Sequence, residues 1–226
     1  MHNDYGNWIL VLVNIVLFLY FLKSCFRPQT KTDWRTFRVF GAFIVALFAE
    51  MYGFPLTIYL LTSFFGNRFN LDYSHDAGHL LNKFLGLTGD PHFSVIHIAS
   101  TMAIAGGFIL IAIAWDVLYK AQQTNTLAIS GPYKYIRHPQ YIGFILIIVG
   151  FLLQWPTLIT LLMAPILITM YMRLAKREED SLAKTFGKTF RDYQKQTPAF
   201  FPSLRRLTVG IIKLLSEKNV RRSVNN

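Results

Sequence analysis

Two polar stretches in the C-terminal half of the chain carry residue types that could bind a ligand with both positive and negative groups. The stretch GPYKYIRHPQYIG places Arg137 and His138 directly before an apolar run, and MRLAKREED places Arg173, Glu178 and Glu179 where a later apolar run ends. A ligand carboxylate would pair with arginine or histidine, and a ligand ammonium group would pair with glutamate. If the intervening apolar segment is a short hairpin, both stretches open at one membrane face and predict a site for an amino-acid-like group.

The same residues also fit a role without chemistry. Arg137, Arg173 and Arg177 could anchor helix ends by extending their charges to the membrane interface, with the carboxylates as solvated partners. Charged residues are common where helices leave the membrane. The residue types alone therefore leave both interpretations open.

The elements that would position these residues are transmembrane helices. The chain has 226 residues, of which 53% are hydrophobic and 15% are charged, a composition outside the ordinary soluble range. A spanning helix needs about 20 mostly apolar residues, and residues 5–22, 37–65 and 94–119 provide such runs. The apolar residues 141–171 are interrupted by QWP at 154–156, which predicts a tight helical hairpin. We therefore expect an all-α integral membrane protein with about five transmembrane helices and a cytosolic C-terminal helical segment.

The net charge of +11 is explained by orientation in the membrane. Lysines and arginines gather between the first two spans, between the third span and the hairpin, and in the C-terminal tail, and the positive-inside rule places these segments in the cytoplasm. The N terminus and the loop at residues 66–93 then lie outside. Anionic lipid accounts for the basic segments, so we expect no nucleic-acid partner. The predicted organisation is an N-terminal membrane region at 1–119, a catalytic region at 120–204 and a basic cytosolic tail at 205–226.

Glu50 lies near the middle of the second apolar run, in the sequence AEMYGFP. A carboxylate is costly inside a membrane, so such a residue by default indicates function and faces the protein interior. The alternative is a protonated Glu50 that only hydrogen-bonds a neighbour. Pro55 follows shortly after and predicts a kink, because proline lacks a backbone donor.

The predicted outer loop contains His75, His79 and His92 together with Asp76 and Asp90. Histidines four residues apart share one face of a helix, as in some zinc sites. The sequence HDAGH also fits capping and turn chemistry, and it lacks the HExxH pattern. We therefore assign no metal ligand from the sequence, and the role of the loop stays open.

The motifs RHPxY, EE and LxxxFGxxFxxYxxxxPxFxP follow one another between about residues 126 and 204. Their residues are Arg137, His138, Pro139, Tyr141, Glu178, Glu179, Leu182, Phe186, Gly187, Phe190, Tyr193, Pro198, Phe200 and Pro202. In this combination the segment resembles the isoprenylcysteine carboxyl methyltransferase and phospholipid methyltransferase family of membrane enzymes. The first three spans and the histidine loop lie outside the resemblance.

The resemblance implies S-adenosylmethionine as cofactor and methyl donor. The residues that would bind it are Tyr133, Tyr135, Arg137, His138, Tyr141, Glu178, Glu179 and Tyr193, with the segment 193–202 closing over it. His138 and Tyr141 would hold the methionine and adenosyl parts, and Glu178 and Glu179 would meet the ammonium or ribose groups. Arg173 stands where the family has an arginine on the acceptor side.

Methyl transfer from a sulfonium is an in-line displacement with a neutral leaving group, so the protein mainly aligns donor and acceptor and excludes water. A carboxylate or thiolate acceptor would need only a positioning cation such as Arg173. An amine acceptor must lose a proton, for which Glu50 or Glu178 could act as base. The catalytic candidates are therefore Arg173, Glu178 and Glu50, and we expect a lipophilic acceptor that arrives from the lipid bilayer.

Two other classes of function stay open. A nicotinamide-dependent membrane reductase of the sterol or steroid type has similar residues around HPxY and the late tyrosines, although the EE pair favours the methyltransferase. A non-enzymatic membrane protein could use the outer histidines to bind metal. In every case we expect a multi-pass protein of a prokaryotic inner membrane, or of the endoplasmic reticulum if the source is eukaryotic, and the resemblance implies an active site facing the cytosol.

Overall fold

The computed structural model describes residues 5–26, 28, 30–69 and 71–202, and these are helical with connecting turns and no strands. The elements in chain order are α1 (Trp8–Cys25), α2 (Lys31–Phe48), the π-helical turn η1 (Ala49–Gly53), α3 (Leu56–Phe65), η2 (Gly66–Phe69), η3 (His75–Gly78), α4 (Leu80–Phe84), η4 (Pro91–Phe93), α5 (Val95–Gln123), η5 (Gly131–Lys134), α6 (Pro139–Gln154) and α7 (Leu158–Gln196). The predicted tail at 205–226 lies outside the described residues.

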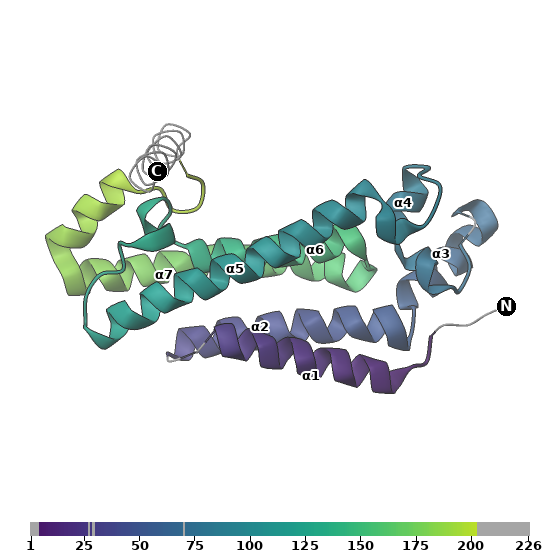
Figure 1. Ribbon diagram of the computed structural model, residues 1–226, viewed down its shortest axis with the longest axis horizontal. Helices are drawn as coiled ribbons and strands as arrows, with labels where there is room; N and C mark the ends of the chain where they lie inside the picture. The colour runs from purple at the N-terminus through teal and green to yellow at the C-terminus, as the bar shows by residue number, and fades with distance from the viewer. Residues whose placement is uncertain (1–4, 27, 29, 70, 203–226) are drawn as a thin grey trace, which may run out of the picture.

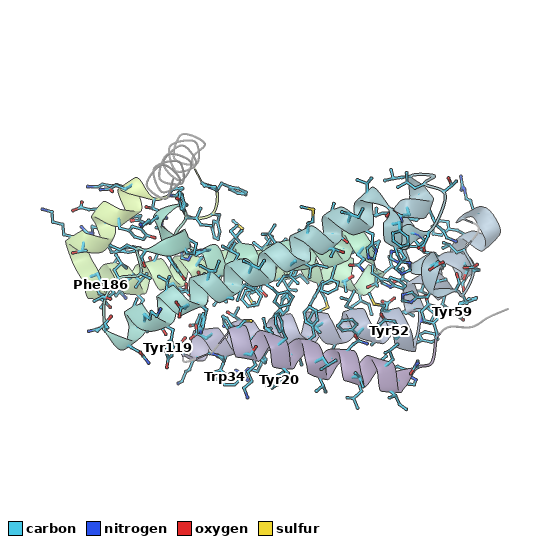
Figure 2. All side chains as sticks on the ribbon, viewed as in Figure 1. Tyr20, Trp34, Tyr52, Tyr59, Tyr119 and Phe186 are labelled. Carbon is cyan, nitrogen blue, oxygen red and sulfur yellow. The ribbon has the colours of Figure 1, made fainter. Side chains whose placement is uncertain are left out.

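Four segments are long and apolar enough to cross a membrane: Trp8–Cys25, Lys31–Gly53, Val95–Gln123 and Leu158–Gln196. Figure 1 shows α1, α2, α5, α6 and α7 running lengthwise, with α3 and α4 gathered at one end. Figure 2 shows Trp34 and Tyr119 toward the opposite end from Tyr52 and Tyr59, and tyrosine and tryptophan favour the two membrane interfaces. The predicted all-α membrane fold is confirmed.

The second apolar run is not one continuous helix, which corrects the predicted span at 37–65. After α2 the backbone forms the π turn η1, Phe54 adopts an extended conformation with φ −126°, and α3 begins only at Leu56. Pro55 explains the break, since it removes a backbone donor and disfavours a helical conformation of the residue before it. The span-length unit is therefore Lys31–Gly53, and α3 is a separate short helix.

The hairpin predicted at QWP is present. Helix α6 ends at Gln154, and α7 begins after Thr157, whose side chain accepts a hydrogen bond from the backbone N–H of Thr160 in a capping box. The turn therefore returns the chain along the bundle, so that both ends of the hairpin lie at one end of the molecule (Figure 1).

Glycines allow α5 and α6 to approach closely. A Cβ atom at Gly107 would lie 2.7 Å from the carbonyl oxygen of Gly143, and one at Gly150 would lie 2.9 Å from that of Ser100. These distances are too short for any side chain, so the helices contact each other through their backbones. The tight contact fixes α6, and with it the residues at its N-terminal end, relative to α5.

An aromatic core connects α2, α6 and α7. The ring centroids of Phe40 and Phe144 are 5.0 Å apart, and those of Tyr141 and Tyr171 are 5.5 Å apart in a stacked arrangement. All four side chains are buried. Their packing holds the start of α6 against the middle of α7, which sets the positions of the polar residues described next.

Candidate active site

A cavity of about 520 Å³ opens where α2 begins, α5 ends and α6 begins, with α7 forming its remaining wall. Its volume falls in the range of small-molecule and cofactor sites. Six residues proposed from the sequence line it: Tyr133, Arg137, His138, Glu178, Glu179 and Tyr193. The hairpin has therefore brought the RHP and EE motifs to one cavity.

Glu179 is the centre of a polar network. Its Oε1 accepts a hydrogen bond from Nε of Arg137 at 2.9 Å and lies 2.8 Å from Nε2 of His138, while Oε2 accepts a hydrogen bond from the Gln194 side chain at 3.0 Å. The side chains of Arg137 and Glu179 are only 11% and 16% exposed. Both oxygens of Glu179 are thus occupied by protein groups.

Glu178 is held differently. Its Oε1 accepts a short hydrogen bond of 2.5 Å from the hydroxyl of Tyr141, and its Oε2 lies 3.7 Å from Nδ1 of His138, a distance for an ion pair but not for a hydrogen bond. The Glu178 side chain is 28% exposed and lines the cavity. This carboxylate therefore remains accessible to a ligand.

The two carboxylates determine the charge of His138, whose side chain is 3% exposed. Burial by itself lowers the pKa of His138, but the negative charges of Glu178 and Glu179 and the hydrogen bond to Glu179 outweigh burial and raise the pKa above its usual value. An imidazolium is thus favoured between two carboxylates. Nδ1 of His138 has no hydrogen-bond partner among the described residues, so it could bind a ligand atom together with Glu178.

The segment after α7 is hydrogen-bonded to Arg137 and His138 of the RHP motif. The backbone N–H groups of Arg137 and His138 donate to the carbonyl oxygens of Pro198 and Ala199 at 2.9 and 3.1 Å, and the Arg137 guanidinium donates to the carbonyl of Thr197. The Phe200 ring lies 5.5 Å from that of His138. These contacts form one side of the site.

Gly187 makes this return of the chain possible. Within α7 it has φ 52° and ψ −118°, outside the helical region, and the helix changes direction there, as Figure 1 shows at the yellow-green end of α7. The hydroxyl of Tyr193, beyond the bend, then donates to the carbonyl of Tyr133 at 2.7 Å. Only glycine adopts such a conformation without strain.

We expect Gly187→Ala to destabilise the C-terminal part of the protein by about 1 to 3 kcal/mol, the usual cost of a strained backbone. The measurement is the thermal unfolding midpoint together with the rate of limited trypsin cleavage between Lys188 and Lys195. Gly106→Ala in α5 is the matched control. A Cβ added at Gly106 or at Gly187 would have no neighbouring atom within 4 Å, but only Gly187 has a positive φ. Equal effects of both substitutions would contradict the prediction.

Two residues predicted to bind the cofactor do not line the cavity. Tyr141 is buried behind its wall, where it reaches the ligand space only through its hydrogen bond to Glu178. Tyr135 is half-buried at the end of η5 and lies outside the lining residues. Tyr133 and Tyr135 are only two residues apart, but of the two only Tyr133 lines the cavity.

Glu50 is also outside this cavity, which corrects its predicted place beside the reacting groups. It follows the far end of α2, about 25 Å along the helix axis from Asp33 in the cavity wall. Its Oε2 accepts a hydrogen bond of 2.9 Å from the backbone N–H of Thr57. The break at Pro55 leaves the first N–H groups of α3 without helical partners, so the observed role of Glu50 is to cap α3.

Arg173 lines a neighbouring groove instead of the cavity. The groove has a volume of about 550 Å³ and lies between α2 and α7, with Arg35, Arg173 and Arg177 as its charged lining residues. Five residues along a helix turn a side chain by about 140°, so Arg173 and Glu178 point to different faces of α7. Arg177 lines both spaces and joins the groove to the cavity.

The sequence interpretation missed three polar residues of the site. Asp33 is 7% exposed and lines the cavity, Gln140 accepts a hydrogen bond from the Tyr133 hydroxyl at 3.0 Å, and Gln194 binds Glu179. Of the three, only Asp33 stands in a recognisable sequence pattern, because Thr30 and Asp33 have the spacing of a capping box and form one at the start of α2. For both glutamines the local sequence carries no such pattern.

The family comparison agrees with this geometry. Residues 95–189 match the family model described as phospholipid methyltransferase. This segment is therefore similar to the phospholipid methyltransferase family. The match begins at the start of α5 and so includes the helix that packs closely on α6. It starts before the resemblance recognised at about 126–204 and ends at residue 189, before the last part of that resemblance.

Individual relatives match over a similar length. A cobalt-zinc-cadmium resistance protein of Cupriavidus metallidurans is 38% identical over 92 residues, which is 40% of this chain and 42% of that protein. The protein-S-isoprenylcysteine O-methyltransferase of Rattus norvegicus is 30% identical over 89 residues, or 39% of this chain and 31% of that protein. The methanethiol S-methyltransferase of Pseudomonas deceptionensis is 35% identical over 78 residues, or 33% and 28%. The matched segments thus span less than half the length of these relatives, and no solved structure matches the chain.

Proposed function

We propose that this protein is a membrane methyltransferase that uses S-adenosylmethionine and acts on a lipophilic acceptor at the cytosolic face. The observation that carries the proposal is the cavity in which Arg137, His138, Glu178 and Glu179 meet, inside the segment that matches the methyltransferase family. Enzymes of this family provide the precedent, and two of the matched relatives are named as methyltransferases.

The cavity residues fit the chemical groups of the donor. Glu178 and Asp33 offer carboxylates to an ammonium group or ribose hydroxyls, and Arg177 offers a cation to a carboxylate. Nδ1 of His138 is buried without a hydrogen-bond partner in the described part of the chain. The apolar and aromatic lining includes Leu182, Phe186 and Phe190, which suits a flat adenine ring.

When bound, S-adenosylmethionine supplies a methyl group on a sulfonium, and its transfer breaks the sulfur–carbon bond and leaves a neutral thioether. The protein's part is to align the reactants and to exclude water. Glu179 orients Arg137 and His138, and these residues fasten the segment at Thr197–Ala199 over the site. Glu179 is therefore a positioning residue, while Glu178 is the carboxylate that contacts the donor.

The groove between α2 and α7 is the proposed acceptor site. Pro165, Ile166 and Met170 give it an apolar wall, and Ile166 is 62% exposed toward the side of the bundle. An acceptor could enter from the bilayer with its hydrocarbon part along this wall and its polar head near Arg173. Arg177, shared with the cavity, marks where the two ligands would meet.

The proposed orientation of the protein in the membrane rests on the positions of its lysines and arginines. Lys31 at the start of α2, Lys134 in η5 and Arg137 lie at the cavity end of the bundle, and by the positive-inside rule that end would face the cytosol. We therefore place the protein in a prokaryotic inner membrane, or in the endoplasmic reticulum of a eukaryotic cell, with the α3–α4 end on the other side.

Calorimetric titration of detergent-purified protein tests the proposal. S-adenosylmethionine and reduced nicotinamide cofactor are titrated separately into folded samples. We expect saturable binding of S-adenosylmethionine and no binding of the nicotinamide. Binding of the nicotinamide alone would overturn the proposal in favour of the membrane reductase, and binding of neither would favour a non-enzymatic protein.

A further inference from the structure

Three histidines meet at the end of the molecule opposite the cavity. One ligand-capable atom of each of His75, His79 and His92 lies within 4.8 Å of those of the other two. They come from η3, from the residue that ends it and from η4, so the cluster is formed by two separate turns and not by one helix face. The ring centroids of His79 and His92 are 4.9 Å apart.

His79 is the buried member of the cluster. Its side chain is 3% exposed, and its Nε2 atom has no hydrogen-bond partner among the residues that the structure describes. A buried polar atom without a partner is unfavourable and rare in folded proteins. A cation held between the three imidazoles would satisfy this atom.

Trp155, in the turn between α6 and α7, packs against two histidines of the cluster. Its ring centroid lies 4.4 Å from that of His75 and 5.0 Å from that of His79. Gly78 permits this contact, because a Cβ there would lie 1.9 Å from the Trp155 ring. The two imidazoles are thus held in place by the tip of the hairpin.

Carboxylates complete the surroundings. Asp90 Oδ1 lies 2.8 Å from Nδ1 of His92, and Asp76 Oδ1 lies 4.0 Å from the same nitrogen. A carboxylate bound to one imidazole nitrogen orients the ring and leaves the other nitrogen for a metal ion, an arrangement common around zinc. The negative charges would also offset part of the charge of a divalent cation.

We propose that His75, His79 and His92 form a binding site for a divalent transition-metal ion of the zinc class. Neutral imidazoles suit such ions, and three of them leave a fourth position for water or for Asp76. Nitrogens bound to one tetrahedral zinc are about 3.4 Å apart, given zinc–nitrogen bonds of about 2.1 Å. Small side-chain rotations would close the observed 4.8 Å to that spacing.

The metal site is independent of the proposed methyl transfer. His138 and Trp155 lie at opposite ends of α6, which has 16 residues and is therefore about 24 Å long. A bound ion would instead join the turns around η3 and η4 to each other over the hairpin tip. Its expected consequence is a more stable non-cytosolic end of the molecule.

Tag-free protein, stripped with chelator, is titrated with Co²⁺ under absorption spectroscopy and with Zn²⁺ by calorimetry. We expect one equivalent of Co²⁺ to bind with the intense visible bands of a four-coordinate ion, Zn²⁺ to displace it, and Zn²⁺ to raise the unfolding midpoint. His92→Ala should weaken Zn²⁺ binding by roughly 100-fold or more, and Asp90→Asn by roughly 10-fold.

The controls separate this cluster from His138, at the other end of α6. The His92 side chain is 43% exposed, so its replacement should leave the metal-free fold intact, which the unfolding midpoint without metal checks. His138→Gln removes a histidine at the other end of α6 and should leave the stoichiometry and affinity unchanged. Absence of stoichiometric binding in the wild type, or equal affinity in wild type and His92→Ala, would overturn the proposal.

Discussion

Arg137→Ala is expected to lower the stability of the protein by about 3 to 5 kcal/mol and to abolish donor binding, because it breaks a buried ion pair and removes the donor that binds the segment after α7. Arg137 binds Glu179 at 2.9 and 2.8 Å and donates to the carbonyl oxygens of Gln194 and Thr197. Its removal therefore leaves His138 as the cationic partner of Glu179 and at the same time releases the segment after α7. The measurements are chemical or thermal unfolding in detergent and calorimetric donor titration.

Two further substitutions make this prediction specific. Arg137→Lys keeps the positive charge but lacks the planar fork that serves several acceptors together, so its loss of stability should be intermediate. Lys120→Ala at the same end of the bundle removes an ion pair with Asp116 whose side chains are 71% and 62% exposed, and such surface pairs contribute about 0 to 1 kcal/mol. If Arg137→Ala were no more destabilising than Lys120→Ala, the network around Glu179 would not organise the site.

The second large effect is expected from Glu178→Gln. This substitution keeps the shape of the side chain and removes the charge that faces the cavity, so donor affinity should fall about 10- to 100-fold, the value of one charge-assisted hydrogen bond. The unfolding midpoint should change little, since the amide oxygen of the substituted side chain can still accept a hydrogen bond from Tyr141. Calorimetric titration with S-adenosylmethionine measures the affinity.

Glu179→Gln is the matched comparison, one residue along the same helix. Both oxygens of Glu179 already bind protein groups, so its replacement should lower stability strongly and affinity only as a consequence. Donor binding that is unchanged in folded Glu178→Gln would contradict the assignment. Equal stability losses in the two variants would show that the adjacent carboxylates do not have separate roles.

The sequence by itself determined the membrane architecture and the grouping of the main motifs. Hydrophobic runs are a local property, so the long apolar helices and the hairpin at QWP could be predicted directly. Once the hairpin was recognised, its short turn required RHP and EE to lie at one end, and the structure places Arg137 and His138 against Glu178 and Glu179. The family resemblance carried by these motifs is confirmed, and the family model matches residues 95–189, which include RHPxY and EE.

Only the tertiary structure decided which side chains meet. The place of Arg173 in the groove depends on how α7 packs against α2, and the place of Glu50 depends on where α2 ends and α3 needs a cap. The return of Tyr193 depends on one non-helical glycine inside a helix, and the meeting of His75, His79 and His92 depends on two turns packed on Trp155. Each of these arrangements depends on how separate elements pack against one another, and hydropathy and spacing carry no information about such packing.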